Sequence, residues 1–186
     1  MKRVSPLLLA CFCGIFLACQ NATYQNSTLF QDLFPDEETT LRGFSLGDQL
    51  DQARQIELPH TPRHADLYGL NYAYDLGENA SVLIDYFPER AKYGYQRDRV
   101  VSIVANVLMP NEVETVRLYN EIQDYFNQKP TYGLPNGSFG DQVWNGSNRF
   151  ISSMEVRLRI DEDKKGLTIN FIDLQPGILS DSVLVE

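Results

Sequence analysis

Apolar and polar residues alternate along several stretches of this 186-residue chain, and a period of two predicts β-strands. The alternation is clearest in residues 154–160, where Met, Val, Leu and Ile alternate with Glu and Arg. Residues 68–76, 80–87 and 167–174 show a similar pattern, whereas residues 99–108 are apolar on both faces, which is typical of a central strand. We therefore expect an antiparallel meander of the first three strands and a hairpin near the C-terminus.

Two other stretches have the helical period. In residues 46–56 apolar side chains recur on one face, and Ser45 is in place to cap the N-terminus. The second helix is expected after Pro110, with Asn111 as its N-cap. Its apolar stripe, which should pack across a sheet, consists of Val116, Tyr119, Ile122 and Phe126.

The predicted elements follow as helix, three strands, helix, a short strand at 139–144 and two final strands. This order predicts an α+β fold in which two packing helices cover an antiparallel sheet, all within one domain, residues 41–186. The order also fits two units of one helix plus three strands, residues 41–109 and 110–176, although the two halves share little sequence.

The segment before this domain, residues 19–40, is polar and aperiodic, which predicts a flexible tether. Within it, residues 29–34 carry four large apolar side chains. Because exposed apolar patches are uncommon on soluble domains, we expect this stretch to dock on the domain. The alternative is a short partner-binding segment.

The N-terminus has the pattern of a secretory signal peptide: Lys2 and Arg3, a mostly apolar run over 4–17, and a small residue before Cys19. The run is shorter than a membrane span, so we expect a cleaved signal peptide, residues 1–18.

The end of that run, Phe-Leu-Ala-Cys at 16–19, resembles the lipobox of bacterial lipoproteins. The resemblance implies that Cys19 is acylated and becomes the new N-terminus. Gln20 then implies the outer membrane rather than the inner one, with the domain in the periplasm or at the cell surface. A soluble secreted product of an ordinary signal peptide is the alternative.

The charge of the chain limits its partners. Removal of the signal peptide takes away two bases and no acids, so the net charge changes from -9 to -11. Such acidity argues against nucleic acid as a partner, and against binding of anionic lipid by charge. The membrane contact is therefore expected through the acyl chains alone.

The clearest candidates for catalysis are His60, His64 and Asp66, which could hold zinc if a fourth ligand came from elsewhere. An envelope hydrolase or metal-dependent enzyme is therefore an alternative function. Pro59 and Pro62 disfavour a helix that would align the two rings, so a solvated loop without metal is favoured. The chain has no Gly-rich phosphate loop, dinucleotide fingerprint or nucleophile elbow, so we expect no cofactor and no catalytic residues.

Aromatic residues supply the candidate binding residues. Tyr93, Tyr95 and Trp144 lie in predicted loops, where binding residues concentrate. Rings with a polar tip suit protein interfaces and stacking on sugars. The tyrosines of the predicted strands are expected in the core instead.

The sequence therefore predicts a non-catalytic, lipid-anchored envelope protein whose domain binds another envelope protein or a glycan. The stretch Gly-Phe-Ser-Leu-Gly-Asp at 43–48 and the predicted architecture resemble small periplasmic lipoproteins of the SmpA/BamE group, and inhibitor-like domains with paired helix–sheet units. The resemblance to the former implies a supporting role in outer-membrane assembly, without assigning a role to any residue.

Overall fold

The computed structural model describes residues 27–58, 60–66, 68–77, 79–89 and 98–175. The elements in chain order are α2 (Thr28–Leu33), α3 (Leu50–Ile56), β1 (His64–Asp66), β2 (Gly69–Leu76), β3 (Ala80–Pro88), β4 (Val100–Leu108), α4 (Glu112–Gln128), β5 (Asn136–Ser138), β6 (Asp141–Gly146), β7 (Met154–Ile160) and β8 (Gly166–Asp173).

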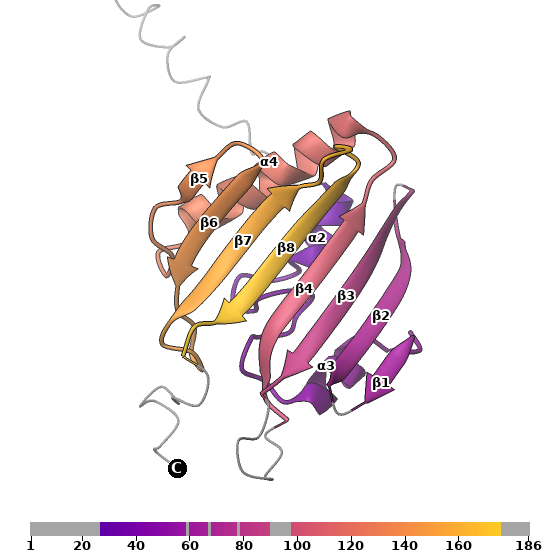
Figure 1. The fold of residues 1–186 in the computed structure, drawn as a ribbon, viewed down its shortest axis with the longest axis vertical. Coiled ribbons are helices and arrows are strands. Elements are labelled where there is room, and N and C mark those ends of the chain that lie inside the picture. The colour runs from indigo at the N-terminus through magenta and orange to yellow at the C-terminus, as the bar shows by residue number, and fades with distance from the viewer. Residues whose placement is uncertain (1–26, 59, 67, 78, 90–97, 176–186) are drawn as a thin grey trace, which may run out of the picture.

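All eight strands form one antiparallel sheet in the order β1-β2-β3-β4-β8-β7-β6-β5 (Figure 1). The predicted meander, β2–β3–β4, and the predicted hairpin, β7–β8, are confirmed by their pairing. The two halves of the sheet meet at the pair β4–β8. Each half consists of one helix followed by four strands, α3 with β1 to β4 and α4 with β5 to β8.

The expected α+β class with two packing helices is wrong. An eight-stranded antiparallel sheet dominates the described residues, which contain three helices rather than two. The units of one helix plus three strands are also wrong, because each half of the sheet has four strands. The additional strands, β1 and β5, are each three residues long, which is too short to show a period of two. The third helix, α2, lies within the segment that its polar composition assigned to the tether.

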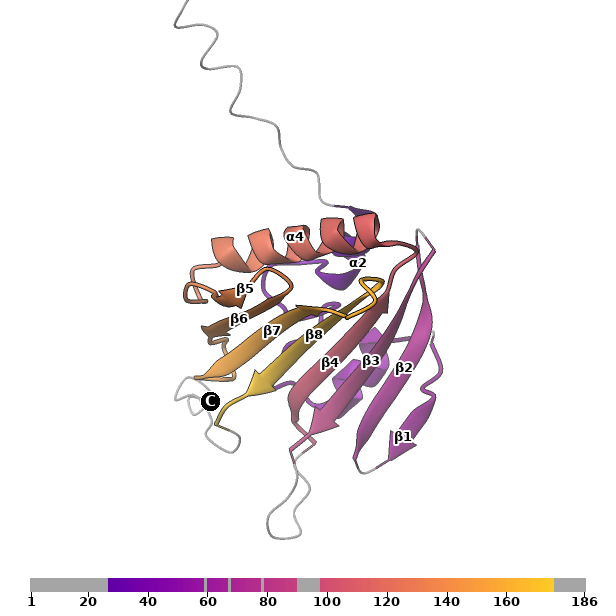
Figure 2. The same cartoon turned by 45° about the horizontal axis from the view of Figure 1, so that its top comes forward.

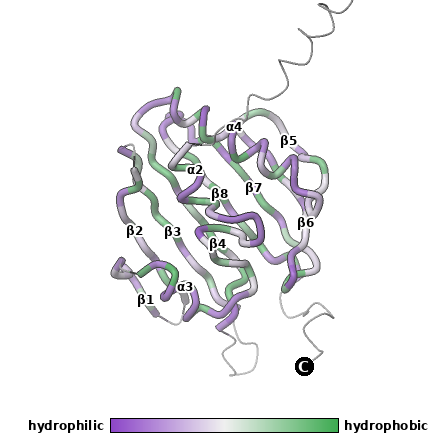
Figure 3. The backbone as a smooth tube through the Cα atoms, turned by 180° about the vertical axis from the view of Figure 1, so that it is seen from behind, coloured by the Kyte–Doolittle hydropathy of each residue, from purple (hydrophilic) through white to green (hydrophobic). Residues whose placement is uncertain are grey.

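All three helices lie on the same face of the sheet, as Figures 2 and 3 show from two directions. Helix α4 packs on β7 and β8, and α3 packs on β2 and β3. The apolar face of α4 consists of Leu118, Tyr119, Ile122 and Phe126. Phe126 links the helices to the sheet, because its ring contacts Phe34, Trp144 and Phe171 at centroid distances of 5.8, 5.4 and 6.1 Å.

Docking of the apolar stretch at 29–34 is confirmed. Leu29, Phe30, Leu33 and Phe34 are all buried, and the Phe34 ring lies 5.0 Å from that of Tyr125 on α4. Ser27 caps α2 and also binds the buried carboxylate of Glu121 on α4. Residues 27–40, predicted as part of the tether, therefore belong to the packed domain.

The N-terminus of each predicted helix tests the N-cap that the sequence indicated, and one of the two N-caps is confirmed. Helix α4 begins as predicted, with the Asn111 side chain accepting a 3.0 Å hydrogen bond from the Glu114 N–H. The first predicted helix begins later than expected, at Leu50, with Gln49 rather than Ser45 as its N-cap. The Ser45 N–H instead donates to the Asp48 carboxylate in a turn before the helix.

The packing of α2 predicts that Leu33→Ala destabilises the whole domain. Leu33 is fully buried, so its truncation leaves a cavity, and we expect a loss of about 2–5 kcal/mol in unfolding free energy. Urea unfolding of the full chain measures this loss. Leu134→Ala is the control, because Leu134 is 94% exposed and should change stability by about 0.5 kcal/mol or less. Similar small effects of both substitutions would show that residues 27–40 do not stabilise the domain.

Candidate functional site

No described element covers the face of the sheet opposite the helices, which we call the outer face (Figure 1). Strand register places one row of outer-face residues across all eight strands. From β1 to β5 this row consists of His64, Asn71, Asp85, Val104, Asn170, Arg157, Val143 and Asn136. Every member is at least partly exposed, whereas the alternating residues of the long strands are mostly buried.

The centre of the outer face carries uncharged polar and aliphatic side chains. Thr168 on β8 donates a 3.0 Å hydrogen bond to the Asn106 side chain on β4. Ser102 and Asn170 form a longer contact of 3.5 Å between the same two strands. These cross-strand contacts hold the amide and hydroxyl groups in place, so the surface is ordered before any partner binds.

Charge differs between the two sides of the outer face. Strands β2 and β3 carry Asp75 and Asp85, and the latter accepts a 2.5 Å hydrogen bond from Asn71. Strand β7 carries Arg157 and Arg159. Arg157 lies 3.8 Å from Glu155, and no ion pair of Arg159 occurs among the described residues. The charged side chains on β2 and β3 are thus carboxylates, whereas on β6 and β7 the guanidinium groups of Arg157 and Arg159 lie beside the carboxylates of Glu155 and Asp141.

A small cavity of about 90 Å³ lies at the β1–β3 side of the outer face. Asp66 forms part of its lining and is held from two directions: its Oδ1 accepts hydrogen bonds from the N–H groups of Tyr68 and Gly69, and its Oδ2 lies 2.8 Å from His64 Nε2. The Tyr68 N–H and then the His64 side chain lower the pKa of Asp66, so this carboxyl group is ionised at neutral pH.

A larger cavity, of about 420 Å³, lies at the opposite side, between α4 and the β7–β8 hairpin. Asp141 and Arg159, which pair across β6 and β7, lie at its edge and also on the outer face. The outer face thus has a cavity near each of its two sides.

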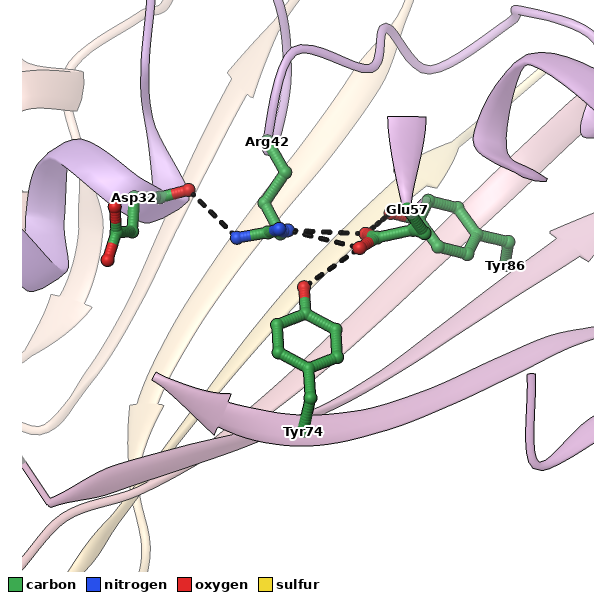
Figure 4. Close-up of polar contacts among 5 residues, drawn as sticks. All are labelled: Asp32, Arg42, Glu57, Tyr74 and Tyr86. Carbon is green, nitrogen blue, oxygen red and sulfur yellow. Dashed lines mark hydrogen bonds and ion pairs between the residues drawn. The ribbon is translucent and has the colours of Figure 1, made fainter. Parts of the chain in front are cut away.

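The helix face contains a buried carboxylate, that of Glu57 at the end of α3 (Figure 4). The hydroxyls of Tyr86 and Tyr74 donate to it at 2.6 and 2.9 Å, and Arg42 Nε lies 3.3 Å from both carboxylate oxygens. Arg42 also donates to the Asp32 carbonyl at 3.2 Å, which connects the end of α2 to this cluster. Because these groups bind one another inside the domain, we assign the cluster to structure rather than to ligand binding.

This environment holds both phenols in the neutral form. Burial, and then the negative charge of Glu57, raise the pKa of Tyr86 well above its usual value. The same two causes, in the same order, raise the pKa of Tyr74. Both tyrosines therefore remain donors to Glu57 at any physiological pH.

The structure corrects one predicted binding residue and leaves two untested. Trp144 lies in β6 rather than in a loop, and its side chain is completely buried, with Nε1 donating to Asn127 at 3.0 Å. It is therefore a core residue and not a binding residue. Tyr93, Tyr95 and the predicted lipidation site, Cys19, lie outside the described residues.

The predicted zinc candidates do not form a metal site. His64 contacts Asp66, but the His60 ring stacks on Tyr74 at a centroid distance of 3.9 Å. The described part of the chain contains no group of three or more His, Cys, Asp or Glu residues that could hold a metal ion. Within the described ranges, His60, His64 and Asp66 therefore do not supply the ligand set that the zinc-dependent alternative expected of them.

Sequence reasoning missed the outer face as a candidate site. A signal was present, since Asn is depleted in strands, yet Asn71, Asn106 and Asn170 occupy the polar positions of three predicted strands. Which of these positions lie side by side depends on strand order, and the order of distant strands cannot be obtained from periodicity.

Comparisons of the chain with protein-family models, with curated proteins and with solved structures find no match. The candidate site is therefore defined by its geometry and chemistry.

Among the described helices, none has both the length and the apolar character needed to cross a membrane.

The phenols that donate to Glu57 predict a loss of stability at alkaline pH. Unfolded tyrosines ionise near pH 10, whereas folded Tyr86 keeps its proton to higher pH, so its contribution is complete below pH 10 and falls as the pH rises above 10. Tyr86→Phe has no such proton. Between pH 8 and pH 11 we expect its unfolding free energy to fall by about 1.4 kcal/mol less than that of the unchanged protein. Urea unfolding at both pH values measures the difference, and equal losses would contradict the prediction.

Proposed function

We propose that this chain is a non-catalytic, lipid-anchored protein of the bacterial cell envelope that binds another protein through its outer face. The observation that carries the proposal is the eight-stranded sheet with three helices on one face and no described element on the other.

The dimensions of the outer face suit a protein partner. Eight strands at a spacing of about 4.8 Å span about 34 Å, and strands of eight residues are about 26 Å long. Their product, roughly 900 Å², is reduced at the corners by the short edge strands. A standard protein–protein interface buries about 800 Å² on each partner, so this face alone is large enough for one.

The chemistry of the face supports specific contact rather than simple apolar burial. Its centre offers the side chains of Asn106, Thr168 and Asn170 for hydrogen bonds, with Val104 and Ile172 between them. The carboxylate of Asp85 on β3 and the mixed charges on β6 and β7, where Arg157 lies 3.8 Å from Glu155, would orient a partner whose charges complement this pattern. Because these groups lie on paired strands, little conformational entropy is lost when they bind.

The predicted lipid anchor limits where the partner lies. Cys19 is eight residues before Ser27, where the described domain begins, so extended chain between them spans at most about 28 Å. An acylated Cys19 therefore keeps the domain close to the membrane surface. The proposed partner is accordingly a membrane protein or another envelope protein held near that surface.

Lipidation at Cys19 predicts that Cys19→Ser releases the protein from the membrane fraction, because the acyl chains are the proposed membrane contact. Fractionation of cells and immunoblotting measure the distribution. Cys13→Ser is the control and should stay with the membrane, since Cys13 precedes the predicted cleavage point. Membrane retention of the Cys19→Ser protein would show that another feature holds it there.

The outer-face interface predicts position-dependent photo-crosslinking in cells. A photo-crosslinking residue in place of Asn170, at the centre of the outer face, should give one adduct of defined mass. The same residue in place of Asp124, which is exposed on α4, should not give that adduct. Adding Arg157→Glu to the first protein should reduce the adduct about tenfold, since it reverses a charge beside Asn170. Equal adducts at both positions, or no effect of Arg157→Glu, would contradict the proposed interface.

A further inference from the structure

The cavity of about 420 Å³ beside α4, which we call the α4 cavity, is built by three separate parts of the chain. Its apolar wall consists of Val116 from α4, Phe139 from the β5–β6 turn and Ile160 from the end of β7. Its volume lies within the range of about 300–1,000 Å³ that is typical of ligand pockets. The α4 cavity is therefore large enough to hold a complete aromatic side chain.

Phe139 is held in an exposed position at this cavity. Its side chain is 63% exposed, and its ring lies edge-on to Tyr119 at a centroid distance of 5.0 Å. The Tyr119 hydroxyl in turn accepts a 3.0 Å hydrogen bond from the Gly140 N–H, which fixes the turn that carries Phe139. A large apolar ring kept in water by a fixed turn is a surface on which a second ring can pack.

The rim of the α4 cavity is more acidic than basic. Four carboxylates, those of Glu112, Asp141, Asp161 and Glu162, face two cations, Arg159 and Lys164. Lys164 already pairs with Glu112 at 2.8 Å. The excess negative charge of the rim favours a ligand that carries cationic groups beside the part that enters the cavity.

We propose that the α4 cavity receives one aromatic side chain of the partner protein, flanked in the partner's sequence by basic residues. This inference rests on the proposed function, and it names the anchor that the partner inserts. Two properties argue for this occupant: the exposed Phe139 ring, which can pair with another ring, and the acidic rim, which complements Lys or Arg beside it. Asp141 and Arg159 connect the cavity to the outer face, so one partner can contact both.

Three short peptides test the charge and ring requirements separately: Lys-Trp-Lys, Glu-Trp-Glu and Lys-Ala-Lys, each blocked at both ends. The full chain carrying Cys19→Ser is titrated with each peptide and followed by the NMR signals of its backbone amides. We expect Lys-Trp-Lys to shift the amides of Gly140 and Ile160, Glu-Trp-Glu to bind at least tenfold more weakly, and Lys-Ala-Lys to cause no saturable shift. Equal binding of the three peptides, or shifts elsewhere on the domain, would overturn the inference.

Two cavity variants and one matched control complete the test. Phe139→Ala removes the exposed ring and should weaken Lys-Trp-Lys binding at least tenfold, and Val116→Phe should do the same by filling the cavity. Leu134→Ala also removes an exposed apolar side chain, but outside the cavity wall, and should leave binding unchanged. If the Asn170 adduct forms and depends on Arg157 but Phe139→Ala binds the peptide normally, the cavity inference alone fails. If the peptide binds as expected and no outer-face adduct forms, the proposed interface fails instead.

Discussion

The pairing of β4 with β8 is the contact on which the rest of the fold depends, because it joins the two halves into one sheet. Residues 102–108 pair with residues 166–172, so the contact closes a long loop of chain that includes α4 and three strands. A buried ion pair, Arg99 with Asp173 at 2.8 Å, lies at the end of this strand pair. A shift of one residue in the pairing would exchange core and outer-face side chains across half of the sheet, so this register determines which residues a partner could contact.

The arrangement of all three described helices on one face of the sheet is the second constraint, and the N-terminal segment supplies one of these helices, α2. Helix α2 and its C-cap Phe34 add four buried apolar side chains to the helix face, and Ser27, the N-cap of α2, binds Glu121 on α4. The Glu57 cluster then ties the chain after α2 to α3, β2 and β3. All three described helices lie on this face, so the opposite face carries no described helix, and that opposite face is the basis of the proposed function.

Periodicity predicted the long elements well and the short ones poorly. The strands of the meander, the β7–β8 hairpin and the Asn111 cap all follow from residues close in sequence. Three-residue strands have no measurable period, and Trp144 lies between Gly- and Asn-rich segments that resemble a loop although it belongs to β6. The Ser45 cap was wrong because Ser45 and Asp48 bind each other in a turn, a use of the same capping residues that sequence spacing does not distinguish.

The sequence by itself determined the net charge, the alternation of the long strands, the start of α4 and the need of residues 29–34 for burial, since each depends on composition or on neighbouring residues. Tertiary structure decided the predominance of the sheet, the burial of Trp144 and Glu57, the separation of His60 from His64, and the row of side chains across the outer face. These features depend on which distant strands become neighbours. That choice is made by the packing of the whole chain, and no local pattern encodes it.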